Sequence, residues 1–160
     1  MNKKSIQIAW TEFANLGELP EEEQDLIRRA IEIAQKSYAP YSKFPVGAAL
    51  LLDNGEAFAG NNQENIAYPS GTCAERTVLN YVHANFPDRK IKVIAITALK
   101  SEAPAPATPC GFCRQVLFEM EQSQQERIRV LLHKIGGATY AFDSTAALLP
   151  LAFEDRFLKG

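Results

Sequence analysis

Three cysteines in this sequence have the spacing of a metal site. Cys110 and Cys113 form a C-x-x-C pair in "TPCGFCRQV", and Cys73 stands in a separate stretch, "GTCAERTVLN". On a helix, side chains at i and i+3 share one face, so the paired sulfurs can hold one ion together. Soft thiolate ligands favour zinc. An odd number of cysteines is a poor disulfide framework, which also favours metal binding or catalysis.

Both cysteine stretches lead into residues with helical periodicity, so we expect the thiols at or near helix N-termini. The positive end of a helix lowers the pKa of a thiol and prepares the sulfur for a metal. A helix start needs no more than a Ser or Asp cap. The thiol, carboxylate and guanidinium of "CAER", from Cys73, Glu75 and Arg76, therefore indicate chemistry beyond capping.

A structural zinc site would need a fourth protein ligand, and the two histidines are the candidates. His83 lies ten residues beyond Cys73 on the same expected helix. That is roughly 15 Å along the axis, which is out of reach. His133 belongs to a strand pattern, and the sequence leaves it open as a ligand. Without it the fourth position is free for water, which is typical of catalytic zinc.

Glu75 and Arg76 fit the needs of an open site with three thiolates. The thiolates outweigh the charge of Zn²⁺, so nearby positive charge is required if the ion is to acidify water. Arg76, three residues after Cys73, can lean back over that sulfur. Glu75 is the candidate base and acid beside the water. Because i and i+2 side chains face apart on a regular helix, this role requires Cys73 to occupy the cap.

Hydrophobic periodicity places these residues in an α/β fold. The order of elements predicts a three-layer α/β/α architecture with a mixed five-stranded sheet. Asn54-Gly55 is a strong hairpin signal between the first two strands. We expect strands over residues 45–53, 56–64, 92–99, 128–135 and 138–142, and helices from Pro20 to before Tyr38, from Cys73 to about Asn85, from Cys110 to about Gln122, and briefly after Asp143-Ser144.

Length and composition are those of one globular domain, residues 1–160. The chain is 46% hydrophobic and 22% charged, with a net charge of −2. No basic stripe suits nucleic acid, and no apolar run reaches the ~20 residues that span a bilayer. We therefore expect a cytoplasmic protein without nucleic-acid or membrane partners. Residues 1–18 form an extension of uncertain role, in which Ile6, Ile8 and Trp10 share one side of a candidate edge strand.

The stretches around these residues resemble the zinc-dependent cytidine deaminases, the small nucleoside-acting branch with three cysteine ligands. "CAER" followed by "PCGFC" is similar to their signature, and the similarity extends through "YAPYSKFPVGAALL" and "NNQENIAYPSGTCAER" over roughly residues 38–118, with a weaker match in "LLPLAF". The resemblance implies a cytidine deaminase-like fold, a Zn²⁺ cofactor and a homotetramer. It also implies hydrolytic deamination of cytidine and 2′-deoxycytidine to uridine, 2′-deoxyuridine and ammonia, in pyrimidine salvage.

The resemblance further implies a role for each matching residue. The zinc ligands are Cys73, Cys110 and Cys113, and the residue that moves protons is Glu75. The substrate-binding residues are Phe44 against the pyrimidine, the backbone N–H of Ala74 at the base carbonyl, Asn62 and Glu64 at the ribose, and Tyr68 and Phe153, which help complete the site of a neighbouring subunit.

Some positions depart from the family's pattern. Ile66 stands where alanine is frequent, Phe112 stands where a small residue is common, and "FED" from Phe153 replaces a frequent "FGP". These departures concern the subunit contacts and the rim of the pocket. They leave the zinc chemistry intact.

Other functions share part of this pattern. An isolated C-x-x-C can be a redox pair or a structural clip, and a non-enzymatic zinc module would close the site and make Glu75 dispensable. A polynucleotide cytosine deaminase would need a basic and aromatic surface, which the acidic pI does not favour. A deaminase of a cytosine-nucleoside antibiotic would keep the cytosine chemistry and alter the ribose side. The preference between cytidine and deoxycytidine stays open.

Overall fold

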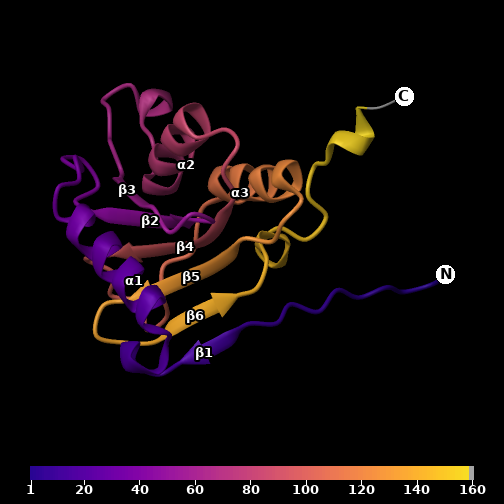
Figure 1. Ribbon diagram of the computed structural model, residues 1–160, viewed down its shortest axis with the longest axis horizontal. Helices are drawn as coiled ribbons and strands as arrows, with labels where there is room; N and C mark the ends of the chain where they lie inside the picture. Colours follow the sequence, from indigo (N-terminus) through magenta and orange to yellow (C-terminus); the bar gives the residue numbers. More distant parts are fainter. Residues whose placement is uncertain (159–160) are drawn as a thin grey trace.

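A six-stranded mixed sheet forms the centre of the structure, a computed structural model that describes residues 1–158. Residues 159 and 160 of the expected single domain lie outside this range. Helix α1 covers one face of the sheet, and α2 and α3 cover the other (Figure 1). Across the sheet the strands are β1 (Thr11–Phe13), β6 (Thr139–Phe142), β5 (Arg129–Lys134), β4 (Ile91–Ala98), β2 (Val46–Leu52) and β3 (Ala57–Asn61), and the helices are α1 (Glu21–Ala34), α2 (Ala74–Asn85) and α3 (Gly111–Gln124).

The three-layer α/β/α architecture is confirmed, but the expected number of strands was wrong. The sixth strand is β1, which pairs antiparallel with β6 from Thr11 opposite Ala141 to Phe13 opposite Thr139. The sequence pattern indicated a strand within residues 5–13, and the structure forms it only over Thr11–Phe13; the chain before Trp10 is exposed and extends away from the body (Figure 1). A strand of three residues carries little periodicity of its own, so its position depends on pairing with β6.

Trp10 anchors the start of β1. Its ring lies 5.8 Å from the ring of Tyr140 and 6.1 Å from that of Phe142, measured between centroids. The contact joins the N-terminal extension to β6 through aromatic packing as well as through the strand ladder. The expectation that this extension docks at an edge of the sheet is therefore confirmed, with the strand starting directly after the tryptophan.

Helix α1 lies unusually close to β2. Pro20 precedes the helix and Glu21–Glu23 fill its first turn, as a helix start favours. Its buried side chains pack on residues of β2, β4 and β5. At Gly47 of β2 an added Cβ would lie 2.0 Å from the carbonyl oxygen of Ala30 and 2.9 Å from the Cβ of Ala34. The absence of a side chain at Gly47 is what permits this approach.

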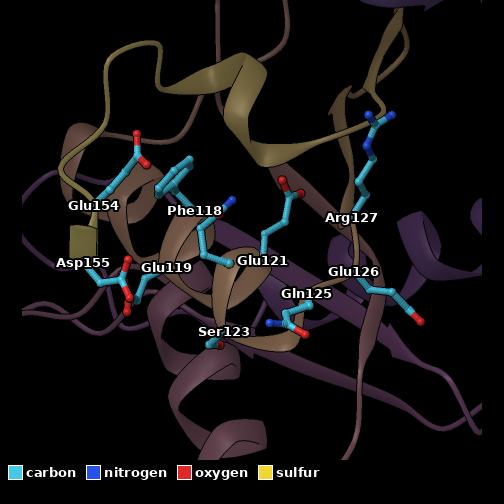
Figure 2. A pocket seen from close by; sticks show the side chains of 10 residues that line it. Phe118, Glu119, Glu121, Ser123, Gln125, Glu126, Arg127, Glu154 and Asp155 are labelled. Atoms are coloured by element: carbon cyan, nitrogen blue, oxygen red, sulfur yellow. The ribbon is translucent and has the colours of Figure 1, made fainter. Parts of the chain in front are cut away.

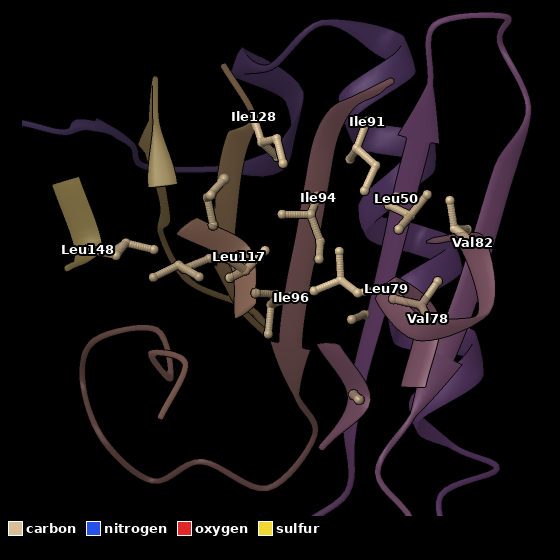
Figure 3. Packing of buried hydrophobic residues seen from close by; sticks show 14 of the residues in the cluster. Leu50, Val78, Leu79, Val82, Ile91, Ile94, Ile96, Leu117, Ile128 and Leu148 are labelled. Carbon is tan, nitrogen blue, oxygen red and sulfur yellow. The ribbon is translucent and has the colours of Figure 1, made fainter. Parts of the chain in front are cut away.

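The larger hydrophobic core lies between the sheet and helices α2 and α3. Leucine, isoleucine and valine side chains from both layers interdigitate there (Figure 3). Because both helices pack on this one core, their positions relative to the strands are fixed. The fully buried members include Leu50, Leu79, Ile94, Leu117, Ile128 and Leu132.

Strand directions bring the ends of several strands together at one end of the sheet. Both β3 and β4 run antiparallel to β2, so they share a direction, and α2 and α3 follow them. Val46, which begins β2, pairs with Ala98, which ends β4. The segment before β2 therefore lies at the same end of the sheet as the starts of α2 and α3. Within the described range, no helix combines the length and apolar character needed to cross a membrane.

Replacing Gly47 by alanine tests the close packing of α1. The new Cβ would meet backbone atoms that cannot rotate away, so Gly47→Ala should lower the free energy of unfolding by about 3 kcal/mol. Urea denaturation measures this change. Gly17→Ala is the control, because an added Cβ there meets no more than the side-chain oxygen of Asn15 at 3.4 Å. Equal stability of the two variants would contradict the packing described.

Candidate active site

The three cysteine thiols converge on one point. Their Sγ atoms all lie within 4.8 Å of one another, and those of Cys110 and Cys113 are 3.7 Å apart. Tetrahedral zinc with Zn–S bonds of about 2.3 Å places its sulfur ligands about 3.8 Å apart. The thiols of Cys73, Cys110 and Cys113 therefore fit a zinc ion in both element and spacing.

Two of the cysteines cap helices. Cys73 is the N-cap of α2 and Cys110 the N-cap of α3, both with extended backbone, and Cys113 lies buried in the first turn of α3. Neither cysteine side chain makes a capping hydrogen bond to the backbone N–H groups of its helix. A hydrogen bond with the Cys113 thiol lowers the pKa of Cys73 to about 6, and the same interaction raises the pKa of Cys113. The cluster thus stabilises a thiolate even before a metal neutralises it.

Glu75 lies buried beside this cluster, with 4% of its surface exposed. Burial raises the pKa of its carboxyl group, and a hydrogen bond with Cys113 and the charge of Arg76 oppose that rise. The positive charge of Arg76 also acts on Cys73, whose pKa it lowers. The requirement that Cys73 occupy the cap is confirmed. Because Cys73 has extended rather than helical backbone, its side chain and that of Glu75 need not point to different faces of the helix.

Neither histidine completes the thiol cluster. His83 is exposed on α2, ten residues from the capping cysteine. His133 is buried on β5 two residues from Leu131, which belongs to the core under α1, so alternation turns both away from α2 and α3. Its Nδ1 lies 2.9 Å from the hydroxyl of Thr139, and burial lowers its pKa. Among residues 1–158 the cluster contains cysteines alone.

A hollow of about 500 Å³ adjoins the cluster. Cys73 forms part of its wall, so a molecule in the hollow can reach the thiol site. Its volume falls in the usual range of about 300–1,000 Å³ for small-molecule sites. The other lining residues include Tyr41, Ser42, Asn62, Glu64 and Tyr68.

The carboxylate of Glu64 is held by the chain that precedes β2. One oxygen accepts hydrogen bonds from the backbone N–H groups of Tyr41 (2.8 Å) and Ser42 (3.3 Å), and the other accepts the hydroxyl of Ser42. The Ser42 hydroxyl is the main cause of the lowered pKa of Glu64. The carboxylate therefore stays ionised and fixed at the wall of the hollow.

Asn62 binds the same preceding segment through its side-chain amide. Its Oδ1 accepts from the N–H of Val46 at 2.8 Å, and its Nδ2 donates to the carbonyl of Phe44 at 3.1 Å. β3 ends at Asn61, one residue earlier than Asn62. The side chains of Asn62 and Glu64 nevertheless both bind the chain that leads into β2.

Of the remaining expected substrate residues, Tyr68 lines the hollow, and Phe44, Ala74 and Phe153 do not. Ala74 is the first residue of α2, where backbone N–H groups lack partners within the helix. Tyr68 lines the hollow and is 76% exposed, with its ring edge-on to Tyr41. Phe44 lies in the loop held by Asn62. Phe153 does not line the hollow; it is 59% exposed in the C-terminal segment, and its carbonyl accepts a hydrogen bond from Gln115.

Sequence reasoning missed the residues that hold this site together. Besides the Ser42 loop, Arg114 binds the carbonyls of Pro109 (2.8 Å) and Leu148 (3.1 Å) and the hydroxyl of Thr108 (3.2 Å). It thereby fixes the segment that delivers the exposed Cys110. The one available signal was its place directly after Cys113, because its partners are set by the tertiary structure.

A larger hollow of about 640 Å³ lies away from the thiols, along the second half of α3 (Figure 2). Its walls are rich in carboxylates, but the main ones are already engaged. Glu126 pairs with Lys90 and Lys92, and Glu121 accepts backbone N–H groups of Ile128 and Thr145. Glu154 likewise pairs with Arg156, so most of these carboxylates already have partners within the protein, and the candidate site remains the hollow beside Cys73.

Comparisons with known proteins agree with this site. The family model described as the cytidine and deoxycytidylate deaminase zinc-binding region matches residues 20–127. A cytidine deaminase of Halalkalibacterium halodurans is 42% identical over 97 residues, 61% of this chain and 70% of its own, and a probable cytidine deaminase of Dictyostelium discoideum is 34% identical over 139 residues, 84% and 88% of the two chains.

A solved structure gives the same result for the fold. The cytidine deaminase of Burkholderia pseudomallei is 39% identical in sequence and superposes with a TM-score of 0.71, covering 81% of this chain and 97% of its own. The matched family region contains the capping cysteines of both helices and the buried glutamate between them. The chain therefore belongs to the cytidine and deoxycytidylate deaminase family.

Proposed function

We propose that this protein hydrolyses cytidine to uridine and ammonia with the help of zinc. The observation that carries the proposal is the buried Glu75 beside three converging thiols, at a hollow large enough for a nucleoside. The family, the named relatives and the solved structure support the same reaction.

Cys73, Cys110 and Cys113 hold the metal in this proposal. Bound there, Zn²⁺ acts as a Lewis acid that lowers the pKa of water. Arg76 and the two helix N-termini offset the negative charge of the three thiolates. The chain thus provides the positive charge that a site with three sulfur ligands lacks.

Glu75 moves the protons. It takes one proton from the water that attacks C4 of the cytosine ring and delivers it to N3. It then takes the proton of the hydroxyl now on C4 and passes it to the departing amine, so that water and cytidine become uridine and ammonia. Burial raises its pKa, and a carboxyl group with a raised pKa can serve as base and then acid near neutral pH. One side chain therefore serves both halves of the reaction.

The hollow holds the rest of the nucleoside. Asn62 and Glu64 bind ribose hydroxyls, Phe44 packs against the pyrimidine, and the N–H of Ala74 donates to the base carbonyl. The ionised state of Glu64 supports its role, because a charged acceptor binds a hydroxyl more strongly than a neutral one. We extend the proposal to 2′-deoxycytidine, as the resemblance to the cytidine deaminases implies.

The proposal also covers the assembly and setting of the protein. We infer one domain over residues 1–160, a homotetramer and a cytoplasmic role in pyrimidine salvage. The exposure of Tyr68 and Phe153 supports a tetramer, because both are large apolar side chains that a neighbouring subunit can cover. Native mass spectrometry measures the number of chains in the assembly.

The purified protein should contain one zinc ion per chain. His133→Gln should retain the metal, because this side chain lies on the face of the sheet away from α2 and α3. Cys113→Ser should lose it, because a neutral hydroxyl is a poor substitute for thiolate. Elemental analysis of folded protein tests this arrangement. Loss of zinc from the His133 variant alone would contradict it.

Glu75→Gln should abolish turnover while zinc and cytidine still bind. Proton transfer by one group contributes about 10²–10⁴-fold, and Glu75 serves several transfers, so we expect a loss of about four orders of magnitude. Single-turnover conversion of cytidine to uridine, followed by absorbance, measures it. Glu121→Gln replaces another buried carboxyl group and is the control, expected to lose stability and keep turnover per folded molecule. A Glu75 variant within about tenfold of the parent would overturn the mechanism.

Glu64→Gln should impair cytidine far more than free cytosine. The substitution removes a charged acceptor worth roughly 1.5–3 kcal/mol, which corresponds to about tenfold or more in kcat/KM. A panel of cytidine, 2′-deoxycytidine, cytosine and a cytosine-nucleoside antibiotic measures this and separates the antibiotic alternative. Glu119→Gln, exposed on α3, is the control. Equal losses for cytidine and cytosine would place Glu64 outside the ribose site.

A further inference from the structure

The hydroxyl of Ser42 joins two parts of the candidate site. It donates to Oε1 of Glu64 and accepts the backbone N–H of Phe44 at 3.1 Å. Its own backbone N–H and that of Tyr41 donate to Oε2 of the same carboxylate. One hydroxyl therefore connects the acidic wall of the hollow with the loop that carries the aromatic residue.

The backbone around Ser42 is held in an unfavourable conformation. Lys43 has φ +56°, in the left-handed region, which costs energy for a residue with a side chain. Its N–H donates to the carbonyl of Ala39 at 3.1 Å, and the bond from Phe44 to the Ser42 hydroxyl spans the same residue. A strained residue persists where surrounding contacts determine its conformation. The turn is thus built to present the hydroxyl and the two N–H groups together.

A second set of bonds aligns the two chain segments independently of Ser42. The N–H of Tyr38 donates to the carbonyl of Asn62 at 3.1 Å, and the N–H of Glu64 donates to the carbonyl of Tyr38 at 2.8 Å. These backbone bonds hold the segments side by side whatever residue occupies position 42. Removing the hydroxyl should therefore loosen the carboxylate, which keeps its two backbone N–H donors, without separating the segments.

We infer that Ser42 is a positioning residue that orients the Glu64 carboxylate for the sugar of the substrate, and so sets the preference for a nucleoside over a free base. The inference rests on the proposed function. Glu64 has rotatable bonds, and an unheld carboxylate would lose that freedom when the sugar binds, at a cost in affinity. The donors of the 41–42 turn fix it beforehand.

The geometry separates this role from general support of the fold. Ser42 is exposed at the hollow and packs in neither hydrophobic core. Ser37, five residues earlier, also donates through its hydroxyl, to the carbonyls of Ala34 (2.8 Å) and Val46 (3.3 Å), and touches no site carboxylate. Ser37→Ala is therefore a matched control for the loss of a serine hydroxyl in this region.

The experiment compares Ser42→Ala, Ser42→Thr and Ser37→Ala with the zinc-loaded parent. Ser42→Ala should raise KM for cytidine about fivefold, as expected for one hydrogen bond, with kcat within about twofold and cytosine turnover unchanged. Binding of the product uridine, measured by calorimetry, should weaken by a similar factor. Ser42→Thr retains the hydroxyl and should restore most of the loss, and Ser37→Ala should leave the ratio of cytidine to cytosine turnover unchanged.

The double variant Ser42→Ala/Glu64→Gln decides whether Ser42 acts through Glu64. If it does, adding the serine change to Glu64→Gln costs little more, because the group being oriented is already altered. Additive losses, or an unchanged cytidine-to-cytosine ratio in Ser42→Ala, would overturn the inference while an active parent upholds the proposed function. A zinc-loaded parent that forms no uridine would overturn the proposed function, and this inference with it.

Discussion

Three sulfur atoms must meet at one point, and the strand directions of the sheet make this possible. Because β3 and β4 both run antiparallel to β2, the helices that follow them begin at the same end of the sheet and lie on the same face. Cys73 and Cys110 cap those helices. The segment before β2 lies at the same end of the sheet, where the Ser42 turn contacts Glu64. The positions of the thiols and of the wall of the hollow therefore both depend on the strand directions of the sheet.

The same convergence creates an electrostatic conflict at Glu75. Burial disfavours the charge of its carboxyl group, and the hydrogen bond with Cys113, the charge of Arg76 and the helix N-termini favour it. Burial is the larger effect, since the pKa of Glu75 is raised despite Arg76. A carboxyl group with a raised pKa accepts a proton more readily than an ordinary one and can then donate it, so the conflict suits a reaction that needs both a base and an acid. Arg76 limits the rise and keeps the group able to accept a proton.

Local features of the site could be predicted from the sequence, and contacts between distant segments could not. The thiols lie at helix starts as periodicity indicated, because capping depends on residues a few positions apart. The strand β1 lies within the stretch indicated as a candidate edge strand, but its bounds and its place as a sixth strand of the sheet depend on the partner β6, because three residues carry too little pattern alone. The bonds of Ser42 to Glu64 and of Arg114 to Leu148 span 22 and 34 residues, so no local pattern announces them.

The departures from the family's pattern fall where they can change assembly without touching the reaction. Ile66 is 79% exposed and Phe112 is 77% exposed, whereas Cys113, one residue after Phe112, is fully buried. Successive residues at this helix start thus face opposite environments: one holds the metal and the other meets solvent. Exposed side chains of this size are costly in water unless another surface covers them. Neither side chain lines the hollow, so we expect their influence to act through neighbouring chains of the proposed tetramer, while Cys113 and Glu75 lie buried.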